Sequence, residues 1–239
     1  MIIKISPVVL SLFVMTVLAG CASTNVTDRQ IYVNENEILP RPNRILVYDF
    51  GATSANVPSS SAFAGELTGN SIPKTDEQIA IANQVGSEIA SELVSQITAM
   101  GLPAYRASTG TTPQINDYVI RGYLVSVVEG SAGERMALGF GAGSSELKTL
   151  VEGFQMTAQG LQKLGSGTVD SSGSKSPGAA LGIAGVIATG NPVGLIVSSG
   201  MKVYGEKSGS STITGRAKQT AKEIANEIRP RFVKQGWIQ

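Results

Sequence analysis

The sequence predicts an α/β domain, in which a small mixed or mostly antiparallel sheet carries two helices on one face and a Gly/Ala-rich insertion. Apolar residues recur every three or four positions over residues 76–100 and 214–229, which is typical of amphipathic helices. Apolar, β-rich runs at residues 44–50, 117–129 and 146–157 are typical of strands. Each helix must cover its apolar stripe, and one face of the sheet is the natural partner.

The chain before the first of these strands is polar and includes Pro40 and Pro42. Such a composition cannot bury enough apolar area to order itself, so residues 21–42 are expected to form a flexible tether. The run RILVYDF at residues 44–50 predicts a largely buried first strand. A long loop rich in Ser, Ala, Gly and Asn is expected over residues 51–74.

The helix over residues 76–100 has signals at both of its ends. Thr75 and Gln78 have the capping-box spacing. Gly101 follows Met100 and is suited to the left-handed conformation that ends a helix. These signals make this the best-defined helix of the chain.

The strands over residues 117–129 and 146–157 are expected to form a hairpin. Shorter strands are indicated at residues 102–107 and 158–170. Within the long strands, Arg121, Lys148 and Glu152 mark a wetter face of the sheet.

A Gly/Ala-rich insertion over residues 171–208 has no charge between Pro177 and Lys202. The segment around Pro192 splits it into halves that are each shorter than the roughly 20 residues of a spanning helix. Three alternatives remain: a packed helical hairpin, a flexible insertion, or a segment that contacts the membrane or another subunit. The small-residue spacing favours Gly182, Gly190, Pro192 and Gly194 as the residues of a membrane or oligomer contact.

The last helix, over residues 214–229, should end or kink at Pro230. Basic residues are concentrated here, which usually means a solvated helix face, and anionic lipid or an acidic partner is the alternative. They are Arg216, Lys218, Lys222, Arg229, Arg231 and Lys234.

The amino-terminal segment has the pattern of a bacterial lipoprotein signal peptide over residues 1–20. Lys4 gives a positive start, an apolar run follows, and Leu18, Ala19 and Gly20 precede Cys21, the only cysteine. Lipidation of Cys21 would anchor the protein, since each buried CH₂ contributes about 0.8 kcal/mol. Because Ala22 and not aspartate follows the cysteine, the outer membrane is expected in a Gram-negative source, with the single domain of residues 43–239 on its periplasmic face.

The amino-acid composition excludes several kinds of functional site. The chain has no histidine, which excludes a Ser-His-Asp triad, a Cys-His pair and a histidine zinc site. With 19 basic and 18 acidic side chains, it has no basic stripe for nucleic acid. We therefore expect no enzyme activity, no catalytic residue, no metal, no cofactor and no nucleic-acid partner.

The glycine-rich run LGFGAGSSEL at residues 138–147 does not fit a nucleotide-binding fingerprint, because its glycines alternate and it joins two strands. It predicts a partner contact instead, in which Phe140 stands between Gly139 and Gly141, with Gly143 beyond.

The run RILVYDF, the hairpin with its GFGAGSSEL turn and the closing QGWI resemble a bacterial lipoprotein family known as domain of unknown function 4410, over roughly residues 42–239. No catalytic residue follows from this resemblance. In architecture the chain is also distantly similar to the curli-secretion lipoprotein and to the amino-terminal domain of the Tol translocation protein, and fold alone does not imply function.

The leading functional hypothesis is a non-enzymatic, lipid-anchored accessory or scaffold protein of an envelope or export assembly, which binds an envelope protein or copies of itself. One alternative is an oligomeric pore-forming or membrane-inserting secretion subunit. A further alternative is a module that binds a small ligand or peptidoglycan.

Overall fold

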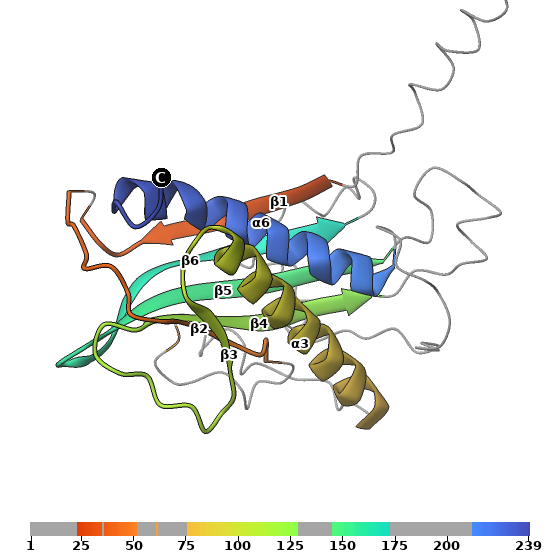
Figure 1. Cartoon of the computed structure of the whole chain (residues 1–239). Coiled ribbons are helices and arrows are strands. Elements are labelled where there is room, and N and C mark those ends of the chain that lie inside the picture. The colour runs from red at the N-terminus through yellow and green to blue at the C-terminus, as the bar shows by residue number, and fades with distance from the viewer. Residues whose placement is uncertain (1–22, 35, 52–60, 62–75, 129–144, 173–211) are drawn as a thin grey trace, which may run out of the picture.

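The computed structural model describes residues 23–34, 36–51, 61, 76–128, 145–172 and 212–239. These form one six-stranded sheet in the order β1-β6-β5-β4-β2-β3, with two helices on one of its faces (Figure 1). The α/β class is thereby confirmed. The elements are β1 Ser23–Ile31, β2 Ile45–Tyr48, α3 Asp76–Ala99, β3 Ala104–Ala107, β4 Tyr118–Val128, β5 Glu146–Thr157, β6 Gly160–Ser172 and α6 Ile213–Lys234.

The sheet is mixed. Strand β2 lies between β3 and β4 and is parallel to both. The remaining neighbours are antiparallel, including β4 with β5, so the predicted hairpin pairing is confirmed from Tyr118↔Gln155 to Val128↔Glu146. The short parallel β3 forms one edge of the sheet and β1 forms the other.

The main core lies between the sheet and the two helices, whose predicted apolar stripes face it. Helix α3 spans Asp76–Ala99, which is almost the whole of the range 76–100 that the sequence predicted. Burying its stripe contributes about 25 cal/mol for each Å² of apolar area removed from water. The buried helix residues are Ile81, Ala82, Val85, Ile89, Ala90, Leu93 and Ile97 on α3 and Ala217, Ala221, Ile224, Ala225 and Phe232 on α6.

The end of α3 confirms the expectation for Gly101, whose φ is +85°. Its N–H donates to the Thr98 carbonyl at 2.9 Å, and the Leu102 N–H donates to the Ile97 carbonyl at 3.5 Å. These two bonds form a Schellman motif, which satisfies carbonyls that would otherwise lack partners.

Phe50 locks α3 against the sheet because it lies between two glycines. An added Cβ at Gly86 of α3 would stand 2.1 Å from the Phe50 carbonyl oxygen, and one at Gly122 of β4 would stand 2.2 Å from the Phe50 ring. Both positions therefore require glycine for close approach.

The expectation of a flexible tether over residues 21–42 is wrong for much of that range, because Ser23–Ile31 forms the edge strand β1. It pairs with β6 through the backbone, from Ser23↔Ser172 to Ile31↔Gly165. An edge strand with one neighbour and mostly exposed side chains does not need an apolar pattern. The polar composition therefore concealed the strand.

The last helix does not end at Pro230, which was one of the two outcomes expected there, since α6 continues to Lys234. The residues beyond the proline explain this. Phe232 and Trp237 are both buried, and their ring centroids lie 5.6 and 5.9 Å from that of Tyr118. This aromatic packing offsets the hydrogen bond that Pro230 cannot donate.

The register defines two ends of the sheet. At what we call the Ser23 end, Ser23, Ser172, Glu146 and Val128 are neighbours across four strands. At the opposite end, called the Trp237 end, β4 begins at Tyr118 and α6 finishes near Trp237. Figure 1 shows the carboxy terminus at the Trp237 end, with β1 and β4 running in opposite directions between the two ends.

Candidate functional site

The residues that the sequence marked for function lie outside the described part of the chain. They are Cys21, Gly139, Phe140, Gly141, Gly143, Gly182, Gly190, Pro192 and Gly194. The structure does describe the residues that flank these segments in the chain, and the flanking residues lie close together at one end of the sheet. Residues 1–22 are followed by Ser23, residues 129–144 lie between Val128 and Ser145, and residues 173–211 lie between Ser172 and Thr212. All of these attachment points belong to the Ser23 end.

Helix α6 begins at the Ser23 end with a capped and partly polar first turn. The Thr212 hydroxyl accepts a hydrogen bond from the Gly215 N–H at 3.1 Å. Arg216 is 2 % exposed and donates to the Gln219 side chain at 3.0 Å. Its burial lowers the pKa of the guanidinium, and the opposite charge of Glu146 partly counters this. One turn further along, the hydroxyls of Thr220 and Ser171 lie 2.8 Å apart.

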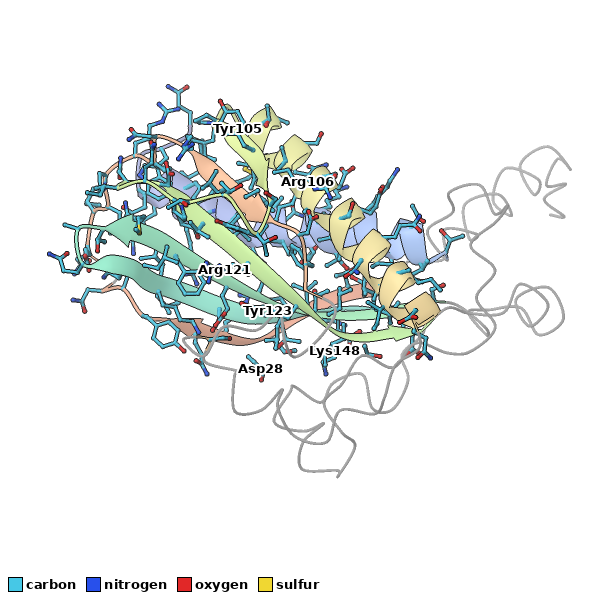
Figure 2. All side chains as sticks on the ribbon, turned by 90° about the horizontal axis from the view of Figure 1, so that it is seen from below. Asp28, Tyr105, Arg106, Arg121, Tyr123 and Lys148 are labelled. Atoms are coloured by element: carbon cyan, nitrogen blue, oxygen red, sulfur yellow. The ribbon has the colours of Figure 1, made fainter. Side chains whose placement is uncertain are left out.

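The face of the sheet away from the helices carries polar and charged side chains, and we call it the polar face. The register places Arg121, Glu152 and Ser166 in one row across β4, β5 and β6, and Lys148 opposite Asp170 in another. Figure 2 shows Arg121, Tyr123 and Lys148 spread along this side of the sheet.

The predicted wetter face is therefore a single face, but its side chains are largely withdrawn from water. Glu152 is fully buried, Lys148 is 9 % exposed and Arg121 is half-buried. Buried charges need partners, so their burial points to a polar network and not to a solvated surface.

Arg121 lies between two aromatic rings on the polar face. Its guanidinium carbon is 5.3 Å from the ring centroid of Tyr48 and 5.8 Å from that of Phe154. This places the cation within cation–π range of both rings. Burial raises the pKa of Tyr48, and the positive charge of Arg121 works against that rise.

Glu152 and Lys163 form an ion pair on the same face, with Nζ 2.5 Å from Oε1. The Lys163 ammonium also lies 5.0 Å from the ring centroid of Tyr32. Nearby, burial raises the pKa of Tyr123 well above its usual value, and the negative charge of Glu152 adds to the rise. Tyr123 is therefore neutral at physiological pH and unsuited to act as a base.

Sequence reasoning missed two hydroxyls of the polar face. Within the described part of the chain, the side chains of Ser166 and Thr168 are buried and make no hydrogen bond. Ser and Thr carry little pattern information in a strand, so only the three-dimensional placement reveals them. Their hydroxyls are suited to hydrogen bonding with a bound polar group.

Two cavities lie on the helix side, where α6 crosses the strands toward the Trp237 end. One of about 160 Å³ is lined by Leu39, Phe232 and Trp237, and one of about 90 Å³ by glycines of β5 and β6. Tyr118 and Arg231 line both. Burial raises the pKa of Tyr118 to about 12, partly countered by Arg231.

The glycines that line the smaller cavity leave room for side chains of β4 and α6. An added Cβ at Gly153 would lie 2.5 Å from the Tyr118 hydroxyl, and one at Gly165 would lie 3.0 Å from Arg231. The ion pair of Arg29 with Glu227, at 2.6 Å, joins β1 to α6 beside this cavity.

Across the described ranges, no three His, Cys, Asp or Glu side chains are grouped so that they could hold a metal ion. Neither described helix is long and apolar enough to cross a membrane.

Comparison with known proteins gives a family and two distant structures. A family model described as a domain of unknown function, DUF4410, matches residues 45–190. No curated protein matches the chain.

Two structures of the PelC dodecamer from Paraburkholderia phytofirmans are similar in part. A single-residue variant has a TM-score of 0.37 and 14% identity, covering 72% of this chain and 98% of the PelC chain. The second has a TM-score of 0.34 and 10% identity, covering 73% and 99%. Scores this low establish no shared fold, and neither structure bears on what this chain binds.

Proposed function

This protein belongs to the DUF4410 family, a family defined only as a domain of unknown function, and we propose that it is a lipid-anchored envelope protein that acts by binding other proteins. In this proposal, Cys21 carries the lipid and the domain lies on the periplasmic face of the outer membrane. The protein supports an envelope or export assembly as an accessory or scaffold and does not catalyse a reaction.

The observation that carries the proposal is the run Leu18, Ala19, Gly20 and Cys21 at the end of an apolar amino-terminal segment. Small residues before a lone cysteine are what a lipoprotein signal peptide requires. The cysteine has no second cysteine in this chain with which to form a disulfide, so lipidation also accounts for an otherwise odd thiol.

A non-catalytic role is supported by the ion pairs that the buried carboxylates make. Glu152 pairs with Lys163, and Arg44 pairs with Asp117 at 2.5 Å. Paired charges of this kind hold a sheet together, whereas a catalytic carboxylate must reach a substrate. The absence of histidine from the whole sequence supports the same conclusion.

The test is photo-crosslinking in cells with the lipidated protein. Probes at Phe140 and Val193 occupy the two segments that the sequence favours for contacts, and a probe at the exposed Asn83 of α3 is the matched control. Adducts to one envelope protein from Phe140, absent from Asn83, would support the proposal. Phe140→Ala should then lose that adduct without unfolding the domain. No protein adduct from either test position would contradict it.

A pore-forming or membrane-inserting subunit is the second candidate, favoured by the uncharged stretch that starts at Pro177 and ends before Lys202. An outer-membrane strand alternates apolar and polar residues over about ten positions, and this stretch does not do so clearly. A ladder of self-adducts in the same experiment, with a ring on sizing, would select this candidate.

A small-ligand or peptidoglycan-binding module is the third candidate. The cavities beside Tyr118 and Arg231 would be its site. Arg231→Ala should then abolish ligand binding with the fold intact, and unchanged binding would remove this candidate.

A further inference from the structure

We infer that the domain stands upright on the bilayer with the Ser23 end of its sheet against the lipid headgroups and the Trp237 end pointing away. This inference rests on the proposed lipidation of Cys21. It assigns a lipid-facing surface to described residues at one end of the domain.

The reach of the chain gives the first argument. Cys21 precedes Ser23 by two residues. Consecutive Cα atoms in a fully extended chain add at most about 3.6 Å each, so the Cα of Ser23 lies within about 7 Å of that of Cys21. The lipid and the start of β1 are thus at the same level, and no spacer separates the domain from the membrane.

The fixed position of β1 gives the second argument. It pairs with β6 along its length, and Val26 packs against the main core. Arg29 of β1 binds Glu227 of α6 at 2.6 Å. Because β1 is held by backbone bonds, packing and an ion pair, a lipid at its start also orients the sheet.

The register gives the third argument. Ser23 is adjacent to Ser172, Ser172 to Glu146, and Glu146 to Val128, so four strands present one end together beside the anchor. Helix α6 also begins there, after Thr212. Figure 1 shows these element ends on the side opposite the carboxy terminus. Ser172 and Thr212, the described residues on either side of residues 173–211, both belong to this end.

The distribution of charged side chains distinguishes the upright placement from a flat one, in which α6 would lie along the membrane. Near the Ser23 end, β5, β6 and the first turn of α6 carry Glu146, Lys148, Asp170 and Arg216, of which all but Glu146 are buried. These residues therefore present no exposed basic side chain to anionic lipid. A domain lying on α6 would instead apply the basic residues Arg229, Arg231 and Lys234 and the half-exposed Val233 to the bilayer. Each basic residue near an anionic surface contributes about 1 kcal/mol, so a flat placement would depend on anionic lipid.

The chain is well suited to a test with thiol labels, because the thiol of its only cysteine would be blocked by the thioether-linked diacylglycerol. A fluorophore is placed on the full-length lipidated protein by Thr214→Cys or Asn25→Cys at the Ser23 end. The matched control labels are Ile115→Cys and Val233→Cys toward the Trp237 end. All four side chains are exposed, so labelling should leave the fold intact, which circular dichroism checks.

The labelled proteins are reconstituted into phosphatidylcholine vesicles that contain a headgroup-bound nitroxide quencher, with and without phosphatidylglycerol. The 12 residues of β5 span about 40 Å, so the two ends differ greatly in distance from the headgroups. The expected result is quenching several-fold stronger at Thr214 and Asn25 than at Ile115 and Val233, unchanged by phosphatidylglycerol.

Two results would overturn the inference, and they differ in what they mean for the proposed function. Equal or stronger quenching at Val233 or Ile115, with the protein bound, refutes the upright placement and leaves the lipid anchor intact. If the unsubstituted protein fails to bind vesicles, as a Cys21→Ser variant should, the anchor itself is refuted and the placement with it.

Discussion

Replacing Gly86 with alanine tests how closely helix α3 packs on the sheet. The new Cβ would lie 2.1 Å from the carbonyl oxygen of Phe50, where ordinary contact begins at 3.4 Å. The obstacle is backbone and cannot rotate aside, so α3 would have to move. Overpacking of this kind lowers the free energy of unfolding by up to about 3 kcal/mol. Alanine has a better helix propensity than glycine, which raises the free energy of unfolding by about 1 kcal/mol. The net decrease is therefore about 2 kcal/mol.

The assay is urea denaturation followed by the emission of Trp237, which is the only tryptophan and is buried. The matched control is Asn83→Ala, at an exposed position of the same helix, which should raise stability by about 0.5 kcal/mol. If Gly86→Ala were as stable as the control, the Phe50 carbonyl would not limit the approach of α3 to the sheet.

A second variant separates backbone from side-chain contact. At Gly122 the added Cβ would meet the ring of Phe50, 2.2 Å away, and not its backbone. Gly122→Ala should therefore recover stability when combined with Phe50→Leu, whereas Gly86→Ala should not. Equal recovery of both would show that the ring, and not the carbonyl, limits the approach of α3.

Three further variants test the helix cap, the buried ion pair and the buried tyrosine. Thr212→Ala removes the acceptor for the Gly215 N–H and should lower the free energy of unfolding by about 1 kcal/mol in the urea assay; no change would remove the cap from the account. Lys163→Met leaves the carboxylate of Glu152 without its ammonium and should destabilise by about 3 kcal/mol, and adding Glu152→Gln should recover most of that loss if the pair is the cause. Because the folded pKa of Tyr118 is about 12 against about 10 when unfolded, the unfolded state loses its proton first and stability should fall as pH rises from about 10 to about 12. Tyr118→Phe should lessen that fall, and an identical alkaline profile would contradict the assignment.

The helices and the central strands follow from local patterns. The stripe of α3 and its terminal Gly101 were visible because a buried helix face repeats apolar residues and because only glycine easily takes a φ of +85°. The hairpin of β4 with β5 was equally clear, since both strands are rich in apolar and β-branched residues. In each case the information lies within a single element.

The features that the sequence did not predict depend on partners distant in the chain. Strand β1 exists because β6 offers a free edge about 140 residues later, and pairing through the backbone leaves no apolar signature. Helix α6 continues past Pro230 because Phe232 and Trp237 pack against the ring of Tyr118.

The candidate site divides in the same way. Cys21 stands out in the sequence because it is a single residue at the end of a contiguous motif. The polar face does not, because Arg121 and Glu152 become neighbours only when β4 and β5 pair in a specific register. From the sequence, Arg121 and Glu152 were expected on a solvated face of the sheet. The sequence of a single strand does not show whether its charged side chains are buried.

The lipid anchor is best tested by mass spectrometry of the amino-terminal peptide of the mature protein, isolated from cells. We expect a peptide that begins at Cys21 and carries a thioether-linked diacylglycerol and an amide-linked acyl chain. A mature chain that begins elsewhere, or a Cys21 with a free thiol, would contradict the lipid anchor on which both the proposed function and the upright placement rest.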